Sequence, residues 1–179
     1  NIFANQVVPG VAFSTKAEAD VPIVAERAMY FSEGKAGHGS PGSPFAAKSW
    51  YFAEGYTGYG TWILLMNPNG SPAQVAVTFL LENGQAVRRD YSLPGTSRLT
   101  VYANSILGEG KAFATKVEAQ APIVAERAMY WGQPQFGHAS LGATAPARIW
   151  YLAEGSTAYP FEEWLLVANP NSRPANLTV

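Results

Sequence analysis

Two histidines are the first candidates for chemistry, because each stands two positions before a serine. His38 precedes Ser40, and His138 precedes Ser140. A Ser–His nucleophile pair also needs an orienting acid and oxyanion donors, and no residue pattern marks either. A metal site usually needs about three or four ligands, and only Glu33 is close to one of the histidines. We therefore expect structural hydrogen bonds here, with no catalytic residue, no metal and no cofactor.

Adjacent glutamate and arginine residues are the second candidate. They occur in the identical segments 22–30 and 122–130. Neighbouring side chains of a strand point to opposite faces, so one charge of each pair should face the interior and need a partner. We expect each arginine to bridge to the glutamate of the Trp-Tyr-x-Ala-Glu-Gly segment that follows it, which begins at residue 50 or 150. The candidate inter-strand or interdomain ion pairs thus involve Glu26, Arg27, Glu54, Glu126, Arg127 and Glu154.

The same carboxylates permit a second interpretation. Glu26 and Glu54 could act as the acid and base of a glycosidase. Every copy of the repeat described below would then need its own substrate groove. We therefore prefer the ion-pair interpretation and expect a protein that is not an enzyme.

Aromatic residues cluster at Trp50, Tyr51, Tyr56, Tyr59 and Trp62. Alternation along strands should bury some of these rings and expose others. An exposed row could stack on sugar rings, so a carbohydrate-binding or adhesion module is the alternative function. In the competing interpretation, Trp50 and Trp62 fill the core while the tyrosines line an interface between units.

Composition narrows the class of protein. Of the 179 residues, 14% are charged, against about 25% in an average globular protein. The net charge of −1 provides no basic field for nucleic acid, and no apolar run is long enough to insert into a membrane. There is no cysteine. Asn176-Leu177-Thr178 fits a glycosylation sequon. Asn1 stands in an apparent strand, so we expect the chain to be a fragment or a processed product.

An internal repeat organises the chain. The nine residues that begin at Pro22 recur unchanged at Pro122, and 15 of 20 positions are identical between residues 12–31 and 112–131. The Trp-Tyr-x-Ala-Glu-Gly segments at 50 and 150 have the same spacing, and the Asn-Pro-Asn segments at 67 and 169 indicate a two-residue insertion. Such a period should be recognised before any other pattern, and about 100 residues is the size of an immunoglobulin-like unit.

Hydrophobic alternation predicts short strands rather than helices within each unit. Val75, Val77 and Phe79 fall on one face, and the turn Asn83-Gly84 follows them. Separate strands are expected over 112–118 and 123–130, for seven in the complete unit. The predicted domains are the last strands of a preceding repeat (1–31), a linker (32–49), a complete β-sandwich (50–131), a linker (132–149) and the first strands of a following repeat (150–179).

These motifs resemble tandem immunoglobulin-like repeats of large secreted or surface proteins of bacteria. The resemblance covers nearly the whole chain and implies an all-β fold with almost no helix, and an extracellular structural or adhesive role. The expected partners are neighbouring repeats. The incomplete units at the two ends leave three alternatives open. They belong to a longer chain, they complement each other within one chain, or the tail of one molecule completes the head of the next by strand addition, giving a filament.

Overall fold

The computed structural model describes residues 1–179, and its regular structure consists almost entirely of β-strands. Its two helices are single turns, α1 (Ala4–Val7) and α2 (Asn104–Leu107). All strand pairs are antiparallel. The strands are β1 (Glu26–Phe31), β2 (Ala36–Pro41), β3 (Ala47–Phe52), β4 (Gly60–Asn67), β5 (Ala73–Leu81), β6 (Ala86–Leu93), β7 (Ser97–Tyr102), β8 (Phe113–Trp131) and β9 (Phe136–Leu141). The predicted all-β class with almost no helix is confirmed.

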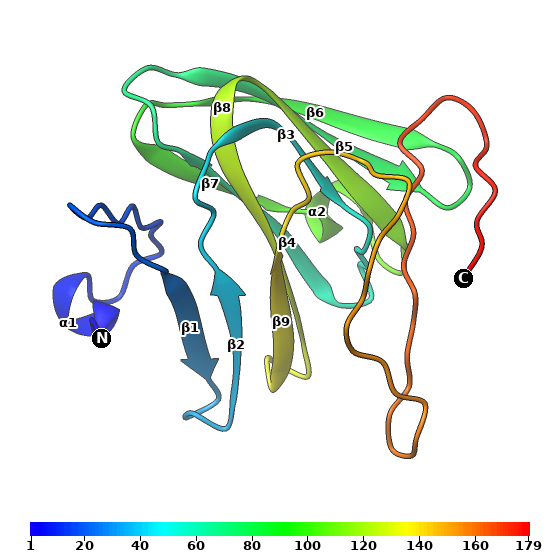
Figure 1. Cartoon of the computed structure of the whole chain (residues 1–179), viewed down its shortest axis with the longest axis horizontal. Helices are drawn as coiled ribbons and strands as arrows, with labels where there is room; N and C mark the ends of the chain where they lie inside the picture. The colour runs from blue at the N-terminus through cyan, green and yellow to red at the C-terminus, as the bar shows by residue number, and fades with distance from the viewer.

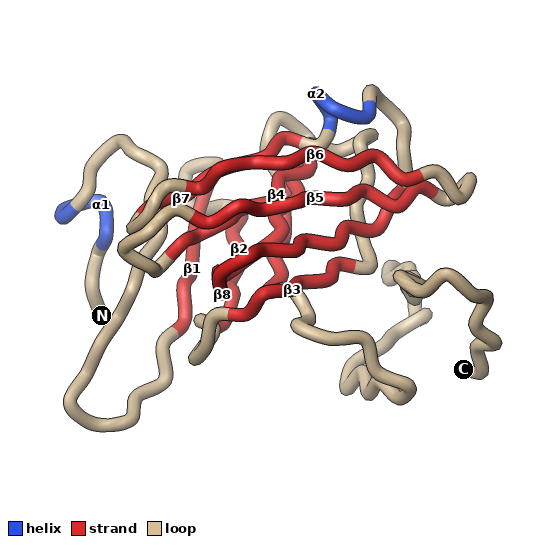
Figure 2. The backbone as a smooth tube through the Cα atoms, turned by 90° about the horizontal axis from the view of Figure 1, so that it is seen from above, coloured by secondary structure: helices blue, strands red, loops and turns tan.

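Strand β8 joins the two halves of the sheet. Its first half pairs with β5 on one edge and β3 on the other, and its second half pairs with β4 and β9. Strands β6 and β7 complete the outer edges. The result is one continuous sheet curled around a core (Figures 1 and 2). This continuity differs from the two independent sheets of a sandwich.

The prediction of two separate strands over 112–118 and 123–130 is wrong, because β8 runs through both. Pro122 lies at the crossing, after the last residue paired with β5 (Ala119) and before the first paired with β4 (Val124). Proline lacks an N–H and normally interrupts a ladder. Here it stands where neither β5 nor β4 pairs with β8, so the strand continues past it.

The core lies inside the curl, and the predicted alternation is confirmed there. Val75, Val77 and Phe79 are fully buried along β5. Trp50 of β3 is also buried, and its indole Nε1 donates to the carbonyl of Ile123 at 2.9 Å. At the tip of the β5–β6 hairpin only Gly84 adopts a positive φ (81°), which is a conformation that glycine tolerates without steric cost.

Two hairpins carry the internal repeat into the structure. In β1–β2, Arg27 lies opposite Ser40 and Met29 opposite His38. In the second half of β8 and β9, the residues 100 positions later are paired in the same register. The segments 32–49 and 132–149, expected to be linkers, therefore contain strands β2 and β9. The glycine and serine residues of these segments predicted loops. The segments form strands because their backbone groups pair with the preceding strand, β1 or β8.

The remaining parts of the repeat form no strands. Residues 1–25 contain only α1, and residues after Ala143, which bridges to Tyr51, contain neither helix nor strand. In Figure 2 these segments extend away from the sheet on opposite sides. The strands expected in 1–25 and 150–179 are absent because strands require paired neighbours for stability.

No helix of the structure has both the length and the apolar character needed to cross a membrane.

Candidate functional site

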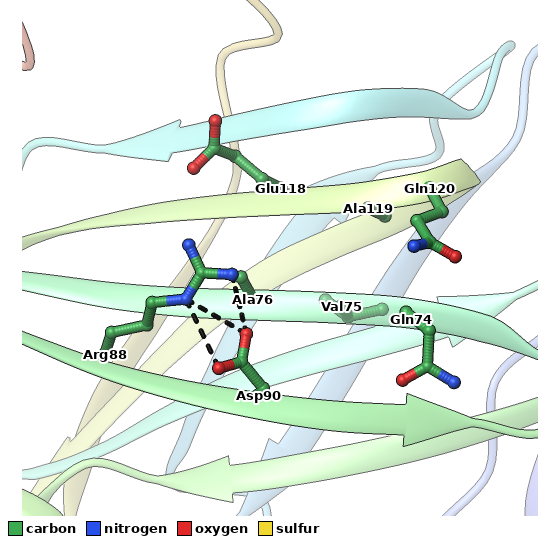
Figure 3. A pocket seen from close by; sticks show the side chains of 8 residues that line it. All are labelled: Gln74, Val75, Ala76, Arg88, Asp90, Glu118, Ala119 and Gln120. Atoms are coloured by element: carbon green, nitrogen blue, oxygen red, sulfur yellow. Dashed lines mark hydrogen bonds and ion pairs between the residues drawn. The ribbon is translucent and has the colours of Figure 1, made fainter.

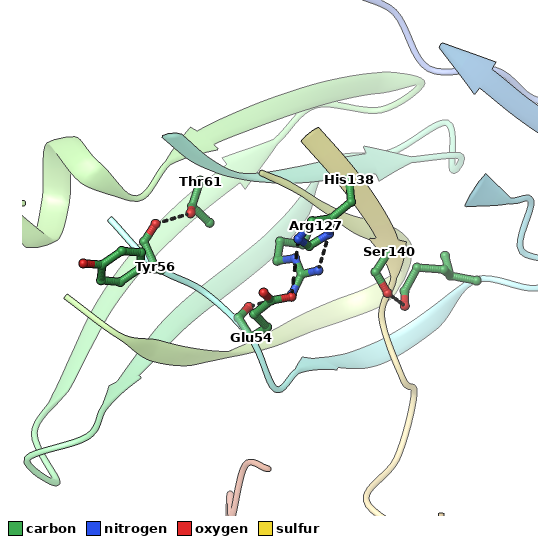
Figure 4. A network of polar contacts seen from close by, with 7 residues as sticks. Glu54, Tyr56, Thr61, Arg127, His138 and Ser140 are labelled. Carbon is green, nitrogen blue, oxygen red and sulfur yellow. Dashed lines mark hydrogen bonds and ion pairs between the residues drawn. The ribbon is translucent and has the colours of Figure 1, made fainter. Parts of the chain in front are cut away.

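A buried arginine is the centre of the main polar cluster (Figure 4). Arg127 lies on β8, and its side chain is only 6% exposed. Its Nη1 lies 2.8 Å from Oε2 of Glu54 and donates to the Glu54 carbonyl at 3.0 Å, while Nη2 is 3.1 Å from Nδ1 of His138. The Nε2 of His138 in turn lies 3.6 Å from Oε2 of Glu54. The cluster thus ties the segment after β3 to β8 and β9.

Electrostatics in this cluster favour the charged carboxylate. His138 and then Arg127 lower the pKa of Glu54 below its ordinary value, against the opposing effect of burial. Burial lowers the pKa of Arg127, and Glu54 counters that effect. A buried guanidinium needs such a partner, because an isolated charge away from water is costly. The Nε of Arg127 remains buried without a hydrogen-bond partner.

The second cluster joins the two hairpins to each other. Nη2 of Arg27 lies 2.8 Å from Oε2 of Glu126. Nε2 of His38 lies 2.8 Å from the hydroxyl of Tyr130, and the ring of Phe31 meets Tyr130 edge-on with centroids 5.4 Å apart. Strand β2 consequently lies beside β9 (Figure 1). The hairpin of one repeat is thereby docked on the equivalent hairpin of the next repeat.

His38 is half-buried at this contact. Burial, then the charges of Arg27 and His138, lower its pKa, while Glu126 acts in the opposite direction. Its Nδ1 is buried and has no partner. The neutral imidazole is therefore the favoured form beside Tyr130, whose own pKa is raised by burial.

The structure brings the predicted ion-pair residues together in a different combination from the one expected. Arg127 meets Glu54, which precedes it in the chain, and not Glu154. Arg27 meets Glu126 and not Glu54. No ion pair involves Glu26 or Glu154. Of the two carboxylates weighed as an acid–base pair, Glu26 is exposed at the start of β1, whereas Glu54 contacts Arg127 and His138. Sequence reasoning overlooked Tyr130 as the partner of His38, although its place in the identical segment was a usable signal.

The aromatic candidates divide between the interior and the surface. Trp50 is buried, whereas Trp62 lies on the outer face between Tyr102 and Tyr130, with ring centroids at 4.9 and 5.4 Å. The expectation that Trp62 fills the core is therefore wrong, because the neighbouring Ile63 takes the inward position. Tyr51 is half-buried. Three exposed rings and the half-buried Trp131 form a surface row in which each ring contacts the next: Tyr56, Tyr59, Trp131 and Phe136.

The other surface features offer little chemistry. Figure 3 shows an open hollow of about 500 Å³ over β5, β6 and β8. Its charges pair with near neighbours, Arg88 with Asp90 at 2.7 Å and Glu118 with Lys116 at 2.8 Å. No group of three or more His, Cys, Asp or Glu side chains lies together as metal ligands would.

Comparisons with known proteins give information about the fold alone. No protein-family model matches the chain, and no curated protein matches it significantly. A crystal structure of Thermotoga maritima 1070 is similar over 56% of this chain and 96% of the other, with a TM-score of 0.53 at 18% identity. The Anabaena sensory rhodopsin transducer has a TM-score of 0.42 at 22% identity, over 45% of this chain and 92% of that one. The first likeness indicates that a fold of this kind can make up nearly a whole chain.

Proposed function

We propose that the chain is a structural module from a tandem array of immunoglobulin-like repeats in a secreted or cell-surface bacterial protein, where it serves as a stalk, sheath or filament component. The observation that carries the proposal is the docking of one hairpin on its equivalent in the next repeat. Arg27–Glu126 and His38–Tyr130 connect positions of adjacent copies directly. A spacer that must keep its shape needs such contacts between units, whereas a flexible tether does not.

The distribution of charge supports this proposal. Arg127 and Glu54 lie inside one copy and stabilise it, while Arg27 and Glu126 lie between copies and set their relative placement. His38 of the second cluster lines an open surface hollow of about 460 Å³, and no residue of the Arg127 cluster lines this hollow or the one over β5, β6 and β8. The alternative of a carbohydrate-binding module is supported less well. Trp50 is buried and Trp62 is flanked by two rings, which leaves a shorter exposed row than the sequence suggested.

Charge exchange at the hairpin contact tests the proposal. Arg27→Glu and Glu126→Arg should each release β1–β2 from β8, because each places like charges together. Combining them should restore the pair. Small-angle X-ray scattering of the full chain should show a larger radius of gyration for each single variant and the original value for the double variant.

Lys35→Glu is the matched control, because Lys35 is exposed in the same hairpin and pairs only with Glu33. It should leave the scattering profile unchanged. If the single variants also leave the profile unchanged, the docking contact does not hold the repeats together and the proposal of a shape-keeping spacer fails.

A further inference from the structure

The repeat allows each position outside the middle copy (residues 47–141) to be compared with its equivalent inside it. We define the head as residues 1–31 and the tail as residues 147–179. Of the fifteen residues in the core of the middle copy, all except Phe79 and Leu93 have an equivalent in the head or the tail. The tail supplies Trp150, Leu152, Leu165, Val167, Ala175, Leu177 and Val179, and the head supplies Ile2, Ala4, Phe13, Ala17, Ile23 and Ala25.

These equivalent residues are exposed although the positions they match are buried. Trp50 is 1% exposed and Trp150 is 61% exposed. Ile123 is fully buried, whereas Ile23 is 58% exposed. Apart from half-buried Ala4, the whole set lies exposed. Apolar area of this extent is unfavourable in water, and the two segments together hold the side chains that bury each other in the middle copy.

We propose that the tail of one molecule binds the head of a second copy of this chain, rebuilding the strand pairings of the middle copy across two molecules. The registers are given by the middle copy. Trp50 lies opposite Val117, so Trp150 should lie opposite Ala17. Leu65 lies opposite Ala125, so Val167 should lie opposite Ala25. The backbone groups of both segments would then be paired as in β3, β4 and β8.

An ion pair gives this association its specificity. In the middle copy, Nη1 of Arg127 forms an ion pair with Oε2 of Glu54. In the head, Arg27 binds Glu126 through Nη2, and its Nη1 has no hydrogen-bond partner. In the tail, Glu154 has no ion-pair partner either. Glu154 of one copy can therefore bind the free nitrogen of Arg27 in another copy while the hairpin contact with Glu126 persists.

The arrangement of the two segments favours a second copy over closure within one chain. Head and tail leave the middle copy on opposite sides of the sheet (Figure 2). Head-to-tail contact of this kind is heterologous and continues from copy to copy. Residues 1–31 and 147–179 contain no equivalent of β6, of the first half of β7 or of the second half of β5, so the core that head and tail form between them is smaller than that of the middle copy. Association should therefore be reversible and should depend on protein concentration.

Disulfide trapping tests the proposed register, because the chain has no cysteine of its own. Tyr51 lies opposite Lys116 in the middle copy, so Tyr151 should lie opposite Lys16. Full-length Tyr151→Cys and Lys16→Cys variants, mixed under mild oxidation, should form a covalent dimer on a non-reducing gel. Asp20→Cys is the matched control and should trap far less, because it lies about 13 Å further along the strand. Equal trapping with both head positions overturns the proposal.

Sedimentation velocity tests the association without cysteines. The unaltered chain should form larger species as its concentration rises, and Leu165→Asp with Val167→Asp should keep it monomeric. Because these residues lie outside the folded middle copy, its thermal unfolding should not change. Tyr159→Asp is the control, since Tyr159 is 98% exposed near the two-residue insertion. A chain that stays monomeric, or a control that dissociates equally, overturns the proposal.

This inference rests on the proposed role as a repeat module, but the two can fail separately. Of the two hairpin variants, Arg27→Glu also removes the proposed partner of Glu154, whereas Glu126→Arg changes a residue that the head-to-tail association does not use. Glu126→Arg, measured at a protein concentration low enough to keep copies apart, therefore reports the shape of one molecule. The tail test changes residues that no hairpin contacts, and its readout is association between molecules.

Discussion

Arg127 and Arg27 occupy equivalent places in the repeat and have different environments. Arg127 is 6% exposed and shares its guanidinium between Glu54 and His138, whereas Arg27 is 40% exposed and binds one oxygen of Glu126. Removing one partner of a buried ion pair leaves the other charge without compensation, which costs far more than losing an exposed pair. The same residue type therefore stabilises the folded sheet at one position and joins β1 to β8 at the other.

Replacing each arginine with methionine should separate these roles. Arg127→Met should lower the free energy of unfolding by about 3–5 kcal/mol, because Glu54 would remain part-buried without its cation. Arg27→Met should lower it by about 0–1 kcal/mol. Urea unfolding followed by tryptophan fluorescence measures both values. Equal losses would contradict the difference in burial on which the prediction depends.

At the scale of elements, the Asn-Pro-Asn corner after β4 forms from its local sequence. Asn67 is fully buried and its amide donates to the carbonyls of Ser71, Leu93 and Pro94. In the tail, Asn169 donates in the same way to the carbonyl of Arg173, and its Oδ1 accepts from the amide of Asn171 as Asn67 does from Asn69. The local hydrogen bonds of the corner therefore form even in the exposed tail. The bonds from Asn67 to the distant carbonyls of Leu93 and Pro94 require the folded sheet.

The two corners offer an internal comparison. Asn67→Ala would leave several part-buried carbonyls without their donor, and each such loss costs about 1–3 kcal/mol. Asn169→Ala should leave the unfolding of the middle copy unchanged, because the tail corner is exposed. Chemical denaturation of the two variants side by side provides the measurement. A large effect of Asn169→Ala would mean that the tail contributes to the folded unit of the same molecule.

For the whole molecule, the structure predicts which backbone amides exchange with solvent most slowly and which exchange fastest. Strand β8 pairs along both edges and lies at the centre of the sheet, so its amides should be the last to exchange with solvent. Residues 1–25 and the chain beyond Ala143 lack strands, so their amides should exchange fastest.

Hydrogen exchange followed by mass spectrometry tests this order. At low protein concentration residues 1–25 and the tail should exchange rapidly, and both should become protected as concentration rises and copies associate. Protection of the tail at the lowest concentration would indicate closure within one molecule. Rapid exchange in β8 would contradict its central position in the fold.

The sequence alone determined the repeat period, the all-β class and the alternation of the buried strands. These features depend on local rules: side chains of a strand alternate between faces, glycine permits tight turns, and identical segments fold alike. The residues of the ion-pair set could also be named, because a buried charge in a strand requires a partner. His38 and its equivalent could be assigned a structural role, but Tyr130 could not be recognised as a partner without knowing how the hairpins pack.

The tertiary structure decided which of these residues meet. It joined two predicted strands into β8, turned parts of two predicted linkers into β2 and β9, and placed Trp62 outside while Trp50 lies inside. It also determined the ion pairs, in which Glu54 binds Arg127 and Glu126 binds Arg27. Such pairings join residues 73 and 99 positions apart, and their choice depends on strand register and on which neighbours are present. Identical segments consequently fold the same way as hairpins and still have different partners in the two copies.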